Sequence, residues 1–64
     1  MSNLKKIRIE KGLTQGQLAI KSHVELRTIQ AYEQGYRDIN KASYENLSKL
    51  ATALKCSVNE LLEE

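Results

Sequence analysis

Two hydrogen-bonding side chains, Arg27 and Gln30, lie three residues apart within the segment 26–34. In a helix this spacing places both on one side, while Ile29 and Tyr32 fall on the opposite side. A guanidinium presents a fork of donors, and a carboxamide presents a donor beside an acceptor. The two groups can therefore form paired hydrogen bonds with guanine and adenine, respectively. The competing interpretation is an ordinary solvated helix surface.

Side chains that make or break bonds are scarce in this sequence. It contains one histidine, His23, and one cysteine, Cys56, which are too few for a Cys/His zinc site or an internal disulfide. It shows no Ser/His/Asp set, no paired-acid motif and no glycine-rich phosphate loop. We therefore expect no enzymatic activity, no metal, no cofactor and no small-molecule ligand. We expect His23 to fill a turn and Cys56 to pack in the core.

The composition indicates one small all-α domain. The chain has 64 residues and lacks proline, tryptophan and phenylalanine, and helix formers dominate it. Its apolar runs are short, and its first residues lack the apolar core of a signal peptide. We therefore expect no membrane span and a cytoplasmic location.

The charge is distributed unevenly along the chain. Residues 1–37 carry seven basic and three acidic side chains, a balance of +4, whereas residues 38–64 carry three and five, a balance of −2. A positive half suits a polyanionic partner. Ordinary scatter of surface charge explains the same numbers almost as well, so charge alone decides little.

Hydrophobic spacing and capping signals predict five helices, over about residues 2–11, 14–22, 26–34, 41–54 and 58–63. Gly12 and Gly35 end the first and third of these. The second begins at a capping box, Thr14-x-x-Gln17, and its end is followed by His23, a residue type that tolerates a left-handed backbone.

The fourth predicted helix begins at Asn40 or Ser43, and a second capping box, Ser57-x-x-Glu60, opens the fifth. An apolar stripe with helical spacing defines the fourth helix, and its members are Tyr44, Leu47, Leu50, Ala51 and Leu54. We expect Tyr44 to be buried with this stripe, as we expect Tyr32 to be buried from the third helix.

The segments 14–22 and 26–34 are two short helices joined by a short turn, with the small residue Ala19 where they would approach closely. Such a pair crosses steeply and leaves one face of the second helix free to enter a major groove. Here the chain resembles the Cro/phage-repressor (XRE-like) helix-turn-helix family. The matching residues are Leu13-Thr14-Gln15, Leu18-Ala19, Val24, Thr28-Ile29, Tyr32-Glu33-x-Gly35, Leu47, Lys49-Leu50-Ala51, Ala53-Leu54 and Ser57-Val58-Asn59-Glu60-Leu61-Leu62.

The resemblance covers about residues 4–62 and implies five helices, of which the second and third read DNA. The sequence departs from the family's pattern at three places. His23 and Lys55 stand where the family usually has glycine, and the loop before the fourth helix is about three residues longer. These departures concern local turn geometry rather than the fold.

The resemblance also implies roles for individual residues. The base-reading positions are Leu26, Arg27, Gln30 and Ala31; the phosphate-contacting positions are Thr14, Gln15, Gln34, Tyr36 and Arg37; and Arg8 and Glu33 correspond to a structural ion pair. Three of these positions or their neighbours have a second interpretation. Leu26 either meets a thymine methyl or is a chance exposed leucine, Tyr36 either donates to a phosphate or plugs the loop, and Glu25 fits a helix start better than a cytosine contact.

The function implied by the resemblance is regulation of transcription by sequence-specific binding to double-stranded DNA. We expect a repressor that acts as a homodimer on a near-palindromic operator, because one short helix reads too few base pairs. We expect the dimer surface at the C-terminal segment with Leu61 and Leu62, unless these leucines simply close the core. The alternative function is a protein-interaction or antitoxin-like adaptor module with weak or no DNA binding.

Overall fold

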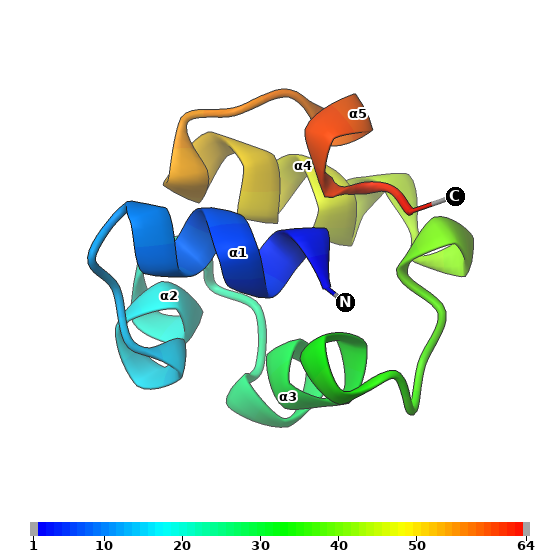
Figure 1. Ribbon diagram of the computed structural model, residues 1–64, viewed down its shortest axis with the longest axis horizontal. Helices are drawn as coiled ribbons and strands as arrows, with labels where there is room; N and C mark the ends of the chain where they lie inside the picture. The colour runs from blue at the N-terminus through cyan, green and yellow to red at the C-terminus, as the bar shows by residue number, and fades with distance from the viewer. Residues whose placement is uncertain (1, 64) are drawn as a thin grey trace.

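The computed structural model describes residues 2–63 and confirms an all-helical fold (Figure 1). Its elements are α1 (Asn3–Glu10), α2 (Gln15–Ser22), α3 (Leu26–Gln34), the short 3₁₀ helix η1 (Ile39–Lys41), α4 (Tyr44–Leu54) and α5 (Val58–Leu61). In Figure 1, α1 crosses the molecule with α4 and α5 on one side of it and α2 and α3 on the other. Within residues 2–63, no helix has the length and apolar character that crossing a bilayer requires.

Side-chain caps explain where α1, α2, α4 and α5 begin. The side chains of Thr14 and Ser57 each accept a hydrogen bond from the backbone N–H three residues later. The side chain of that later residue accepts a bond from the backbone N–H of the cap residue. Both predicted capping boxes are therefore confirmed. Ser43, not Asn40, caps α4, because its hydroxyl accepts from the amide of Asn46.

Two helix boundaries differ from the predicted ranges. The range 41–54 begins too early for the fourth helix, because η1 occupies 39–41 and α4 begins at Tyr44, as the alternative start at Ser43 predicts. η1 exists because Ile39 is buried as an anchor and Asp38 caps the amide of Asn40. The fifth helix ends at Leu61 rather than 63, since the backbone turns extended at Leu62.

Hydrogen bonds to neighbouring elements hold the extended residues 62 and 63. The side chain of Asn3 donates to the carbonyl oxygen of Leu62 over 2.7 Å, and the amide of Glu63 donates to Asn40 Oδ1 over 2.8 Å. The side chain of Asn40 also donates to the carbonyl oxygen of Glu63. These bonds replace the last helical turn that the sequence pattern predicted.

One core fills the space between the helices. Its buried apolar members are Leu4, Leu18, Val24, Ile29, Tyr32, Ile39, Leu47, Leu50, Ala51, Ala53, Leu54 and Leu61. The prediction for Tyr32 is confirmed, whereas that for Tyr44 is wrong, because its side chain is 75 % exposed. Tyr44 is the first residue of α4, and the buried stripe of that helix begins one turn later, at Leu47.

The C-terminal leucines mainly close the core. Leu61 is fully buried, and Leu62 is half-buried against the same cluster. The alternative in which Leu61 closes the core is therefore confirmed, and a dimer surface on the rest of the C-terminal segment, with Leu62, stays a prediction. Cys56 is half-buried against the core, and burial raises the pKa of its thiol, which keeps the group neutral and poorly nucleophilic.

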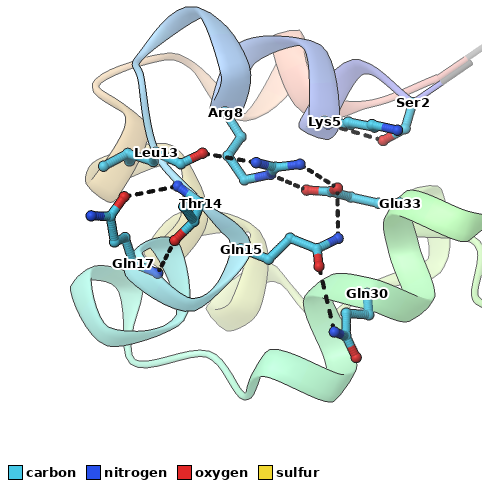
Figure 2. Close-up of polar contacts among 9 residues, drawn as sticks. All are labelled: Ser2, Lys5, Arg8, Leu13, Thr14, Gln15, Gln17, Gln30 and Glu33. Carbon is cyan, nitrogen blue, oxygen red and sulfur yellow. Dashed lines mark hydrogen bonds and ion pairs between the residues drawn. The ribbon is translucent and has the colours of Figure 1, made fainter.

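A buried ion pair connects α1 to α3 (Figure 2). Arg8 Nε lies 2.7 Å from Glu33 Oε2, and Arg8 also donates to Glu33 Oε1 over 3.0 Å and to the carbonyl oxygen of Leu13 over 2.8 Å. The two side chains are 10 % and 1 % exposed. The hydrogen bonds to Glu33 raise the pKa of Arg8, so the guanidinium stays charged at any working pH. This is the pair that the family resemblance implied.

The two departures from the family's glycines adopt the backbone conformation that glycine would. His23 ends α2 with φ 61° and Lys55 ends α4 with φ 55°, both in the left-handed region. Non-glycine residues there are strained by about 1–2 kcal/mol. Both turns therefore have a backbone conformation that glycine would adopt without this strain.

Substituting Lys55→Gly should raise the free energy of unfolding by about 0.5–1 kcal/mol, because relief of left-handed strain exceeds the entropic cost of glycine. Urea denaturation followed by circular dichroism measures the change. Thr52→Gly, at an exposed position inside α4, is the control and should lower stability by about 0.2–0.5 kcal/mol, because threonine is itself a poor helix former. Equal losses from both substitutions would contradict the assigned strain.

Substituting Arg8→Met should destabilise the fold by about 3–5 kcal/mol, because it leaves the buried carboxylate of Glu33 without its counter-charge. The double variant Arg8→Met/Glu33→Leu should recover much of this loss, since it removes both charges. Thermal and urea unfolding of both proteins test the argument. A double variant as unstable as the single one would show that packing, not charge, explains the loss.

Candidate nucleic-acid interface

Helix α3 is fixed to the molecule along one side only. Ile29 is fully buried and Tyr32 is 6 % exposed, and Val24, just before the helix, is buried as well. On the other side, Arg27 and Gln34 are exposed. The prediction that Arg27 and Gln30 project outward while Ile29 and Tyr32 stay inside is confirmed for Arg27, Ile29 and Tyr32, whereas Gln30 is half-buried.

The remaining predicted reading positions share this outward side to different degrees. Leu26 is 42 % exposed, which leaves its methyl groups accessible, and Gln30 and Ala31 are half-buried along the two flanks of the helix. Within residues 2–63 the ion pairs are Arg8–Glu33 and Lys49–Glu45, so Arg27 faces solvent without a carboxylate partner. A long, charged, unpaired side chain beside accessible apolar and amide groups is chemically suited to reading base edges.

A chain of hydrogen bonds joins the flank at Gln30 to the buried ion pair (Figure 2). Gln30 Nε2 donates to Gln15 Oε1 over 3.4 Å, and Gln15 Nε2 donates to Glu33 Oε1 over 3.0 Å. Glu33 in turn accepts two bonds from Arg8. The side chain of Gln15 is therefore oriented by α3 and sits between α2 and the outward side of α3.

The start of α2 presents donors near this flank. Thr14 Oγ1 accepts from the amide of Gln17 over 3.0 Å, and Gln17 Oε1 accepts from the amide of Thr14 over 2.9 Å. The first amides of α2, at Gln15 and Gly16, remain without intrahelical acceptors. The second N–H of the Gln15 carboxamide is also unused. Free amides at a helix N-terminus suit phosphate oxygens. The geometry suits the sequence expectation for Thr14 and Gln15 but does not test it.

The other flank of α3 ends at Gly35, where φ is 82° and the chain reverses. Tyr36 beyond it is 81 % exposed, so the alternative in which it plugs the loop is wrong. Arg37 is exposed, and it lines a shallow hollow together with Glu25, Arg27, Thr28 and Ala31.

Two residues of this hollow were not assigned as contacts from the sequence. Thr28 is half-buried and was placed beside the buried side, and Glu25 was assigned to the helix start. Glu25 precedes α3, and within residues 2–63 its side chain makes no capping bond to the helix. The signal that could have found Thr28 is its spacing, because it lies three residues before Ala31 and shares that flank.

Comparison with known proteins agrees with this geometry. Residues 4–61 match the family model described as helix-turn-helix. The crystal structure of the restriction-modification controller protein C.AhdI from Aeromonas hydrophila is similar, with 37 % sequence identity, 94 % of this chain and 86 % of that chain covered, and a TM-score of 0.82. No curated protein sequence matches the chain. The chain belongs to the XRE-like helix-turn-helix family of DNA-binding transcriptional regulators.

Proposed function

We propose that this protein binds double-stranded DNA sequence-specifically as a homodimer and represses transcription at a near-palindromic site. The observation that carries the proposal is the one-sided burial of α3, with Arg27 exposed opposite the buried Ile29 and Tyr32. A helix held rigidly along one side can enter the major groove with its other side.

Each outward side chain has a distinct partner in this proposal. Arg27 forms the bidentate pair with guanine N7 and O6 for which a guanidinium fork is shaped. Gln30 pairs with adenine through the N–H and oxygen that its bond to Gln15 leaves free. Leu26 contacts a thymine methyl, and Ala31 leaves room for a base to approach closely.

Phosphate contacts on either side of the groove orient α3. Thr14, Gln15 and the free amides of α2 approach one strand, and Gln34, Tyr36 and Arg37 provide donors beyond the other end of α3. Such contacts contribute affinity and register without reading sequence. Gln15 contacts a DNA phosphate and also accepts a hydrogen bond from Gln30. It therefore couples the position of the DNA backbone to the side chain that reads a base.

The length of the reading helix supports a dimer. The nine residues of α3 span about 13 Å, so a single copy reaches only a few base pairs. Two copies about 34 Å apart would read successive major grooves. The related protein is a restriction-modification controller protein, which supports a regulatory role of the same kind. Because Leu61 is fully buried in one copy, the dimer contact is expected at other residues.

Selection of duplexes from random DNA should enrich near-palindromes with half-sites about one helical turn apart. Binding to the selected duplex should weaken steeply as salt rises, with a slope in log K against log salt of about −0.9 for each phosphate contact. Sedimentation of the complex should show two protein chains per duplex. No enrichment and no mobility shift at low salt would instead favour the protein-interaction adaptor.

Substituting Arg27→Ala should cost about 1–3 kcal/mol of binding to the selected duplex and relax preference at one base pair of each half-site. Gln15→Ala should weaken binding to selected and random duplexes by similar factors, because it mainly removes a phosphate donor. Lys6→Ala on α1 is the control for loss of one exposed positive charge. Equal losses on selected and random DNA for Arg27→Ala would refute its reading role.

A further inference from the structure

The side chain of Arg37 lies against an aromatic ring of the reading helix. Its Cζ is 5.8 Å from the centroid of the Tyr32 ring and over the ring's face, within the range of a cation–π interaction. Tyr32 is 6 % exposed although its helix borders the open side of the molecule. A guanidinium stacks on a ring more favourably than an ammonium because it is planar and weakly hydrated.

The backbone of Arg37 is held independently of its side chain. After the reversal at Gly35, the amides of Tyr36 and Arg37 donate to the carbonyl oxygen of Ala31 over 2.9 and 3.2 Å. These bonds return the chain to the penultimate turn of α3, so the side chain of Arg37 begins beside Tyr32. Backbone and ring together fix its direction.

We propose that Tyr32 is a positioning residue that holds the guanidinium of Arg37 ready for a DNA phosphate beside the reading helix. The inference rests on the proposed DNA-binding function and adds a role that a buried tyrosine would not otherwise have. Arg37 lines the hollow together with Glu25, Arg27, Thr28 and Ala31, which places it on the flank of α3 away from Gln15. A free arginine would lose more side-chain entropy on binding than one already restrained.

A double-mutant cycle on the selected duplex tests this role, with Tyr32→Met, Arg37→Ala and the double variant measured at several salt concentrations. Arg37→Ala should reduce the magnitude of the salt slope by about 0.9 for each chain that contacts DNA. Tyr32→Met should weaken binding by about two- to fivefold in the native background and leave it unchanged in the Arg37→Ala background. Tyr32→Phe, which keeps the ring, should bind as the native protein does.

Two further measurements separate positioning from folding and from DNA binding itself. Unfolding curves identify a temperature at which every variant is fully folded, and binding is measured there. In the free protein, proton NMR should show ring-current shifts of the Arg37 side chain that persist in Tyr32→Phe and vanish in Tyr32→Met.

Different results of these experiments test the positioning role of Tyr32 and the proposed DNA binding separately. If Tyr32→Met weakens binding equally with and without Arg37, or if Tyr32→Phe is as defective as Tyr32→Met, the positioning role is wrong while DNA binding stands. If the native protein binds no selected duplex at any salt concentration, the proposed function fails and the positioning role with it, whatever the ring-current shifts show.

Discussion

The buried contact between Arg8 and Glu33 is the constraint on which the arrangement of this protein depends. It is the one charged pair within residues 2–63 that is almost withdrawn from water, and it joins the first helix to the third. A shift of α3 along α1 would break the ion pair and leave a buried carboxylate without its counter-charge, which would strongly destabilise the fold. Its guanidinium also binds the carbonyl oxygen of Leu13, so the connection into α2 is held at the same point.

From this pair, a series of side-chain contacts leads to the surface that we propose binds DNA. Glu33 fixes the carboxamide of Gln15, and Gln15 accepts a bond from Gln30 on one flank of α3. On the opposite flank, Tyr32 lies under the guanidinium of Arg37. The open face of helix α3 thus has a restrained polar side chain on each side, and the exposed Arg27 lies between them. Restraint of this kind reduces the entropy lost when a ligand binds.

Much of the fold follows from local sequence signals. Thr14, Ser57 and Gly35 predict helix ends because each satisfies a particular geometric need, and the structure has helix ends at all three. The errors lie where tertiary contacts decide. Burial of Ile39 produces a 3₁₀ turn that no periodicity predicts, and α5 ends early where Asn3 donates to the carbonyl oxygen of Leu62 and Asn40 accepts from the amide of Glu63.

The candidate site was predictable in part for similar reasons. Helical spacing alone places Arg27 opposite Ile29, and the family resemblance supplies the Arg8–Glu33 pair. Neither shows that Arg37 folds back over Tyr32, because that contact depends on the reversal at Gly35. Periodicity also predicts wrongly that Tyr44 is buried, because the spacing of apolar residues does not show at which turn of a helix the core begins.

The most direct test of this account is a crystal structure of the protein with its selected duplex. The account predicts α3 in the major groove, with Arg27 and Gln30 within hydrogen-bond distance of base edges and Arg37 against a phosphate. A complex in which α3 faces away from DNA, or in which Arg27 reaches no base, would contradict it.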